Sequence, residues 1–176
     1  LIRRVDAEDL RPGAHGGHGQ RLRCVHRPAG DHQHGFVAGR LDLRQGRVDV
    51  VLVGCDRVAM NGDVANKVGT YLKALAAWDN HLPFYVACPV STIDPWARSG
   101  DAIPIEERDP RALTHVSGRA PDGLILEVQV VPEGSPALNP AFDITPARLV
   151  SALITEQGTC DASVPGLRRL IGNERA

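Results

Sequence analysis

The sequence predicts an α/β fold with a mostly parallel sheet flanked by helices. Two short apolar runs carry this prediction: Val50–Val53, which ends at Gly54, and Phe84–Cys88, which ends at Pro89. Continuous apolar runs are typical of strands that are buried on both faces, as in parallel sheets. A segment with helical periodicity separates the two runs, and a strand, a helix and a second parallel strand together form a βαβ unit.

The composition fits one globular domain. The chain has 176 residues, of which 43% are hydrophobic and 23% are charged, as in ordinary domains of this size. A net charge of −1 provides no field that would attract nucleic acid or a membrane surface. No apolar run approaches the roughly 18 residues of a membrane helix. We therefore expect neither nucleic acid nor a membrane among its partners.

The cysteines are widely spaced and form no Cys-x-x-Cys pair, which argues against a zinc site and against a disulfide framework. We expect reduced thiols in a cytoplasmic protein. The start of the chain, Leu1-Ile2 followed by Arg3, predicts no secretory signal peptide. The cysteines are Cys24, Cys55, Cys88 and Cys160.

Residues 1–46 differ from the rest of the chain. They are rich in glycine, arginine and histidine, and they show no hydrophobic periodicity before Phe36. Such a segment buries too little apolar area to offset the entropy lost on ordering. We expect residues 1–46 to be irregular and mostly poorly ordered, apart from one short helix at Phe36–Gln45, and residues 47–176 to form the folded domain.

Two histidine pairs in this segment have the spacing of metal ligands: His15 with His18, and His32 with His34. They lie in a glycine-rich stretch that shows no helical pattern and offers no supporting carboxylate. We therefore predict no metal site.

Between the two apolar runs, the polar loop Cys55–Asp63 leads to a predicted helix. Apolar residues at helical spacing indicate one buried face for this helix. After the second run, the segment Pro89–Asp109 is predicted to be mostly loop. The stripe of the helix comprises Val64, Val68, Tyr71, Leu72 and Leu75.

Three short elements are predicted next. A strand is expected near Leu113–Val116, a turn at Gly118–Gly123, and a strand at Leu124–Val131, where apolar residues alternate with polar ones. A final helix is predicted to begin at Thr145, which would cap it, and to end at Gly158. Its predicted apolar stripe is Leu149, Leu153 and Ile154, and the tail Asp161–Ala176 is polar.

Asp56 is the first candidate functional residue. It follows the first apolar strand by two residues, and in open α/β sheets ligands bind at the carboxyl ends of strands. Partial desolvation there would raise the pKa of a carboxyl group and suit it to acid catalysis. A salt bridge to Arg57, or a cap for the following helix, explains its position equally well.

The segment Asn61-Gly62-Asp63 predicts a turn in which Asp63 caps the next helix. The start of that helix would offer free N–H groups to an anion. Asn66 would add an amide, and Lys67 would add a point charge suited to phosphate. A turn with a structural cap and no ligand is the simpler alternative.

Four separated blocks resemble one family. They are GCDRVAMNGDVANKVGTY, PFYVACPVSTID, IPIEER and NPAFDITPARLVSALITEQG, in this order. Together they resemble the signature of the methylthioribose-1-phosphate isomerases of methionine salvage. The same superfamily includes ribose-1,5-bisphosphate isomerases and regulatory subunits of the translation-initiation exchange factor. Asp56-Arg57 and Asn61-Gly62-Asp63 favour the isomerase branch.

This resemblance implies a Rossmann-like α/β domain, preceded by a smaller helical domain, usually in a homodimer. It implies an aldose–ketose isomerisation of 5-methylthioribose 1-phosphate that needs no cofactor. By resemblance, Asp56 is the proton donor, and Asn66 and Lys67 contact the sugar phosphate. A non-catalytic interaction subunit, like those of the exchange factor, is the alternative from another class.

The family's Arg-Gly-Ala loop and its catalytic cysteine in a Thr-His-Cys-Asn context do not occur in this sequence. We therefore expect a truncated form of the domain, with its activity as a single chain in doubt. The pattern changes abruptly near Arg47, and we hypothesise that residues 1–46 are a wrong-frame remnant joined to an intact carboxyl part.

Overall fold

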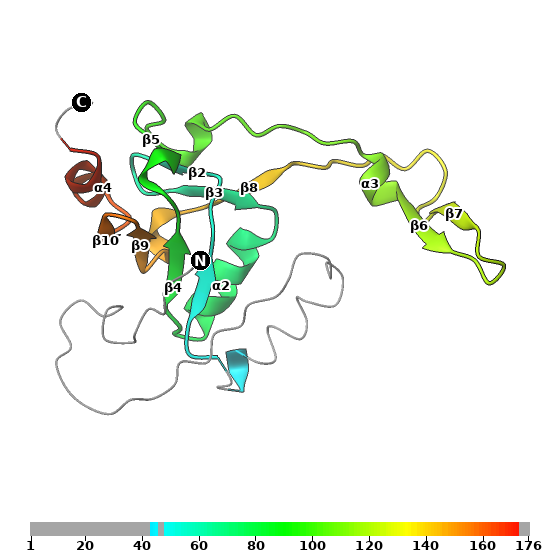
Figure 1. Cartoon of the computed structure of the whole chain (residues 1–176), viewed down its shortest axis with the longest axis horizontal. Helices are drawn as coiled ribbons and strands as arrows, with labels where there is room; N and C mark the ends of the chain where they lie inside the picture. The colour runs from blue at the N-terminus through cyan, green and yellow to red at the C-terminus, as the bar shows by residue number, and fades with distance from the viewer. Residues whose placement is uncertain (1–42, 46–47, 173–176) are drawn as a thin grey trace.

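The computed structural model describes residues 43–45 and 48–172. Within these ranges, two four-stranded sheets and two longer helices form the body, and a two-stranded hairpin lies apart from it (Figure 1). The predicted α/β class is confirmed. Most of the predicted helix Phe36–Gln45 and both histidine pairs lie outside the described residues.

The first sheet contains both predicted apolar strands as parallel neighbours. β4 is parallel to β1 and to β9, and β10 is antiparallel to β9. Phe84 and Val86 on β4 are fully buried, whereas Leu52 on β1 is 38% exposed because β1 lies at the edge of this sheet. Burial on both faces is thus confirmed for β4 and wrong for β1. The strand order is β1 (Val51–Val53), β4 (Phe84–Ala87), β9 (Ala152–Thr155), β10 (Gly158–Cys160).

The helix predicted to begin at Val64 begins instead at Thr70, as α2 (Thr70–Asp79). Val64 and Ala65 are both 0% exposed, since successive side chains of strand β3 (Val64–Lys67) are buried on opposite faces. Gly69, at φ 98°, separates strand from helix. The apolar residues that appeared to form one helical stripe therefore come from a strand and from the helix that follows it.

A second sheet, mostly antiparallel, was not predicted. β3 pairs antiparallel with β2 and β8, and β2 pairs parallel with β5. This sheet includes the segment before Thr70 that was predicted as helix, and its strand β8 ends at Thr145, the residue predicted to cap the final helix. The order is β5 (Ile93–Asp94), β2 (Arg57–Ala59), β3, β8 (Phe142–Thr145).

The final helix predicted from Thr145 to Gly158 is wrong. Thr145 is fully buried at the end of β8, and its hydroxyl has no hydrogen-bond partner there. The chain then forms the 3-10 turn η4 (Ala147–Leu149) and the β9–β10 hairpin, in which Gly158 adopts φ 116°. Pairing of β9 with the buried strand β4 supplies the hydrogen bonds that a helix would otherwise have made.

The predicted polar tail contains a helix, α4 (Val164–Ile171). Ser163 caps it by accepting a hydrogen bond of 3.2 Å from the Gly166 N–H, and Pro165 lies in its first turn. Leu167 is fully buried against the main core. Ser163 with a proline two residues later is a helix start signal that can be read from the sequence, but the polar composition of the tail concealed it.

Two short 3-10 turns, η2 (Val90–Thr92) and η3 (Gly100–Ala102), lie in the predicted loop Pro89–Asp109. Beyond them, the IPIEER and NPAF segments run side by side. Arg108 N–H donates to the Asn139 carbonyl at 2.8 Å, and Ala141 N–H donates to Glu106 at 2.9 Å. These paired segments carry the hairpin away from the body (Figure 1).

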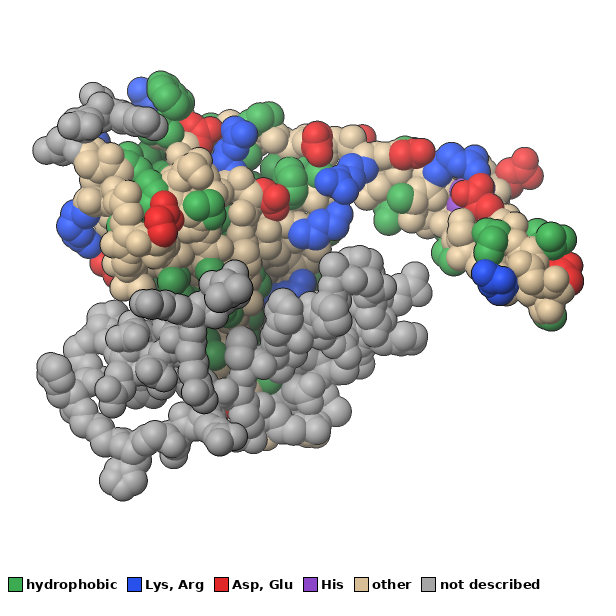
Figure 2. All heavy atoms as spheres, viewed as in Figure 1, with side chains coloured by type: hydrophobic (Ala, Val, Ile, Leu, Met, Phe, Trp, Pro, Cys, Tyr) green, Lys and Arg blue, Asp and Glu red, His purple; other side chains and the backbone are tan. Residues whose placement is uncertain are grey.

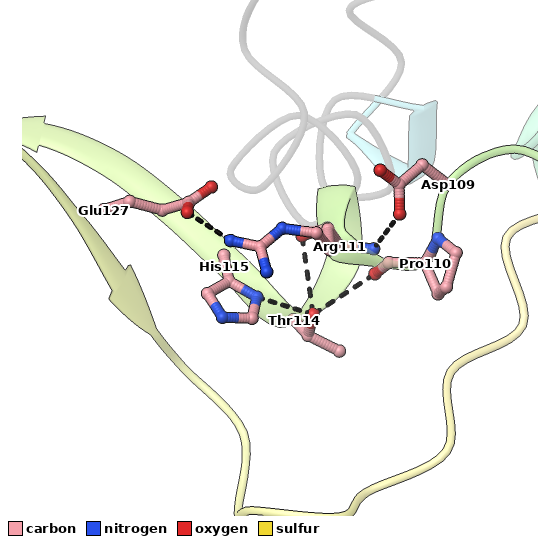
Figure 3. Close-up of polar contacts among 6 residues, drawn as sticks. All are labelled: Asp109, Pro110, Arg111, Thr114, His115 and Glu127. Atoms are coloured by element: carbon pink, nitrogen blue, oxygen red, sulfur yellow. Dashed lines mark hydrogen bonds and ion pairs between the residues drawn. The ribbon is translucent and has the colours of Figure 1, made fainter.

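The hairpin consists of β6 (His115–Arg119) and β7 (Ile125–Gln129), which confirms the predicted turn and the second predicted strand. Residues 111–114 form α3 (Arg111–Thr114), so the first strand begins later than predicted. Figure 3 shows how α3 joins the hairpin: Arg111 forms an ion pair with Glu127, and the Thr114 hydroxyl lies 2.8 Å from Nδ1 of His115.

No helix in the described part of the chain has the length and apolar character needed to cross a membrane.

Gly62→Ala is expected to lower the free energy of unfolding by about 2–3 kcal/mol. Gly62 has φ 92°, and an added Cβ would lie 2.3 Å from the carbonyl oxygen of Ala162. Gly158→Ala is the control, because its φ is also positive but no atom lies within 4 Å of its Cβ; about 1 kcal/mol is expected. Urea unfolding measures both, and equal losses would contradict the contact with Ala162.

Candidate functional site

Asp56 lies in the segment that connects β1 to β2. Its backbone N–H donates a hydrogen bond of 2.9 Å to the Ala65 carbonyl, which fixes the main chain beside β3. The residue is exposed. The predicted partial desolvation of this carboxylate is therefore wrong for the described chain, because β1 is an edge strand and its carboxyl end is open.

Asp56 nevertheless lies close to a second predicted site residue. It precedes β2 at a bend, and the Ala65 carbonyl to which its N–H is bonded belongs to the residue just before Asn66 on β3. Asn66 is in turn paired with Asp143 on β8. Directly opposed residues share a face of a sheet, so Asn66 and Asp143 form a polar pair on one face, and Asp56 lies just before the neighbouring strand β2.

The start of α2 does not offer the open anion site that the sequence predicted. The Asp143 carboxylate accepts hydrogen bonds from the N–H groups of Gly69 at 2.6 Å and Tyr71 at 3.1 Å. These are the donors that a bound anion would use. The protein's own carboxylate, 72 and 74 residues away in sequence, takes the predicted place of the ligand.

Asn66 is held by the same helix start. Its Nδ2 donates to the Thr70 hydroxyl at 3.0 Å, and that hydroxyl donates to the Lys67 carbonyl at 2.7 Å. Thr70 is 2% exposed. The Asn66 amide therefore has a fixed orientation before any ligand arrives.

Lys67 and Asn66 are successive residues of a strand, so their side chains start from opposite faces. The helical arrangement predicted for this pair is wrong. Lys67 is exposed and sits on the same face as Arg57. Arg57 forms an ion pair of 3.0 Å with Asp94 on β5, so the structure pairs Arg57 with Asp94 and not with Asp56.

Asp63 does not cap α2, as the sequence predicted. Its carboxylate accepts hydrogen bonds from Nδ2 of Asn61 at 2.7 Å, from Gly100 N–H at 3.0 Å and from Ala147 N–H at 2.9 Å. Burial raises the pKa of Asp63, whereas the three hydrogen bonds lower it. Their combined effect is larger than that of burial and holds the pKa below its ordinary value of 3.8. Asp63 thus ties the loop before β3 to η3 and η4.

Metal binding receives no support from the described residues, which hold no group of three or more His, Cys, Asp or Glu side chains that could hold an ion.

Sequence reasoning missed Asp143 and Asp94 as partners of the candidate site. The fourth sequence block contains Asp143, but the groups that this carboxylate binds lie more than 70 residues away in the chain. A local sequence pattern cannot indicate a contact over that separation.

Residues 40–162 match the sequence pattern of the "Initiation factor 2 subunit family". The chain belongs to that family. Similar curated proteins are named methylthioribose-1-phosphate isomerase. One from Methylorubrum extorquens is 57% identical over 140 residues, and one from Sinorhizobium medicae is 59% identical over 134 residues.

Solved structures of the family are also similar. A 5-methylthioribose 1-phosphate isomerase from Pyrococcus horikoshii OT3 is 36% identical, with a TM-score of 0.66 over 77% of this chain. A translation initiation factor eIF-2B subunit delta from A. fulgidus is 35% identical, with a TM-score of 0.61 over 76% of this chain. The chain spans 38% and 37% of the two curated relatives and 36% and 37% of the two solved chains.

Asp63→Asn is expected to lower the free energy of unfolding by about 2–3 kcal/mol at neutral pH, because an amide cannot accept all three hydrogen bonds. The folded pKa lies below the unfolded value, so the ionised carboxylate stabilises the fold above pH 3.8. That stabilisation disappears as the pH falls through the folded pKa.

The difference between wild type and the Asp63→Asn variant should therefore shrink on acidification below about pH 4. Urea unfolding across a pH series provides the measurement. Asp101→Asn, a change at an exposed carboxylate in η3, serves as the matched control and should show no such pH-dependent loss.

Proposed function

We propose that this chain contributes to the isomerisation of 5-methylthioribose 1-phosphate to 5-methylthioribulose 1-phosphate in methionine salvage. Relatives that are 57% and 59% identical bear the name methylthioribose-1-phosphate isomerase. The observation that carries the proposal is the place of Asp56, whose N–H is bonded to the Ala65 carbonyl, close to the preoriented amide of Asn66, the next residue of β3. It places an accessible acid beside a fixed hydrogen-bonding group.

In this proposal Asp56 is the general acid. The anomeric phosphate of the substrate prevents ordinary ring opening, so a proton must be delivered to the ring oxygen as the C–O bond breaks. Asp56 is exposed in the described chain, so the bound substrate itself would have to exclude water from this carboxyl group.

Asn66 and Lys67 are the proposed substrate contacts. Thr70 accepts the N–H of the Asn66 amide, which leaves the amide oxygen oriented to accept a sugar hydroxyl. Lys67 is exposed on a flexible stem at the end of β3 and suits a phosphate group. Because the α2 amides bind Asp143, the lysine, and not the helix start, is the proposed phosphate contact.

The proposed reaction moves hydrogen within one molecule, so no redox cofactor is included. The proposed location is the cytoplasm, in line with the reduced thiols that the cysteine spacing predicts.

Asp56→Asn is expected to reduce kcat by about 10²- to 10⁴-fold, the usual contribution of a positioned acid. The assay measures turnover of 5-methylthioribose 1-phosphate by the full chain. It is run alone and with a separately produced segment of the M. extorquens relative that this chain does not match. Asp79→Asn, at the exposed far end of α2, is the control.

Activity that appears only in the mixture, and that Asp56→Asn removes, would support a catalytic contribution that needs further residues. Equal activity of Asp56→Asn and Asp79→Asn would exclude Asp56 as the acid. Absence of turnover in every mixture would favour the alternative below.

The alternative is a non-catalytic interaction subunit of the exchange-factor type, and the hairpin favours it. One face of the hairpin is apolar, with side chains that are 48% to 62% exposed, and Figure 2 shows hydrophobic side chains at the surface of the hairpin. A two-stranded hairpin with such a face is marginal in water. These side chains are Val116, Leu124, Leu126, Val128 and Val130. Either function fits the homodimer that we propose, with this face as the contact between copies.

Leu126→Lys is expected to shift the protein from dimer to monomer, because it places a charge in the centre of the apolar face. Analytical ultracentrifugation measures the mass against the 18.9 kDa of one chain. Ser117→Lys, on the polar face of the same hairpin, is the matched control and should leave the dimer intact. Identical masses for wild type and both variants would contradict the proposed contact.

A further inference from the structure

Two free thiols lie next to each other at the carboxyl edge of the first sheet. Val51 pairs with Phe84 and Val53 with Val86 across β1 and β4. Two residues further along both strands, the parallel register places Cys55 opposite Cys88 and on the same face. Both cysteines contact the main hydrophobic core, and each thiol shifts the pKa of the other.

The spacing suits a covalent bond. Opposed residues on neighbouring strands lie roughly 4.8 Å apart, within the Cα separation of about 4.4–6.8 Å that disulfides need. Cys55 follows Gly54 and lies beyond the paired residues of β1. Its backbone can therefore adjust without breaking the ladder between β1 and β4.

We propose that Cys55 and Cys88 form a dithiol modification site, which hydrogen peroxide converts to an intrachain disulfide. One sulfur, as the thiolate, attacks the peroxide oxygen; the O–O bond breaks, the sulfur becomes a sulfenic acid, and water leaves after protonation. The second thiol then attacks this sulfur, forms the S–S bond and releases another water. Two electrons pass from the sulfurs to the peroxide.

The interaction between the two thiols assigns them different roles. The interaction with Cys55 lowers the pKa of Cys88, and the interaction with Cys88 raises that of Cys55, although burial and Glu156 oppose the lowering at Cys88. Cys88 is 7% exposed and Cys55 is partly exposed. A small oxidant entering past Cys55 would therefore react first at Cys88, and Cys55 would resolve the sulfenic acid.

The third thiol among the described residues provides an internal comparison. Cys160 is buried on β10, opposite Leu153 of β9. β9 separates β10 from β4, so Cys160 belongs to the same core without being the strand neighbour of Cys88. The proposed bond is thus one of the two pairings that Cys88 could make with thiols in the described part of the chain.

The dithiol site does not depend on the proposed isomerisation, but it lies next to the proposed acid. Cys55 directly precedes Asp56, so the disulfide would fix the segment that carries this carboxylate to the end of β4.

The test treats the full chain carrying Cys24→Ser with limiting hydrogen peroxide, followed by alkylation and peptide mapping by mass spectrometry. The expected product is a Cys55–Cys88 peptide lighter by two hydrogen atoms, reversed by dithiothreitol, with Cys160 still open to alkylation after unfolding. Adding Cys160→Ser should leave this product unchanged, whereas adding Cys55→Ser should replace it with overoxidised Cys88.

A Cys88–Cys160 disulfide, or three thiols that remain alkylatable after peroxide treatment, would overturn the proposal. Circular dichroism of each variant before oxidation identifies any that fail to fold, and the Cys24→Ser chain alone suffices to decide the pairing.

Discussion

The described fold depends on carboxylates that accept backbone N–H groups from distant segments. Asp63 bonds the main chain at Gly100 and Ala147, and Asp143 bonds it at Gly69 and Tyr71. A charged acceptor forms stronger hydrogen bonds than a neutral one. Three stretches separated by dozens of residues, namely residues 63–71, Gly100 and residues 143–147, are thereby fixed to one another.

These anchors explain why the acidic residues of the four sequence blocks do not all belong to the chemistry. Asp63 and Asp143 are used within the fold, while Asp56 is exposed and keeps its carboxylate available. Asp143 holds the start of α2 and is paired with Asn66 across β8 and β3, whereas Asp56 lies at a bend just before β2. The proposed acid is therefore next to these structural hydrogen bonds but does not take part in them.

Two exposed features of the described surface would change their environment inside a larger assembly. The hairpin presents an apolar face, and the carboxyl edge of the first sheet leaves Asp56 in the open. Similar isomerases and exchange-factor subunits extend well beyond the segment matched here. An interface that covered either feature would bury apolar side chains in one case and desolvate an acid in the other.

The sequence by itself determined the α/β class, the parallel strands β1 and β4, and the turn of the hairpin, because each rests on a local run or on turn-forming residues. It could not distinguish β3 from the first turn of a helix, since Val64 and Val68 fit either period. It also could not place Thr145 in a strand, because the partner strand is distant in the chain. Tertiary structure decided the environment of Asp56 and the occupation of the α2 start by Asp143. Both depend on which strand lies at the sheet edge and on pairings across more than 70 residues, and no local pattern encodes these.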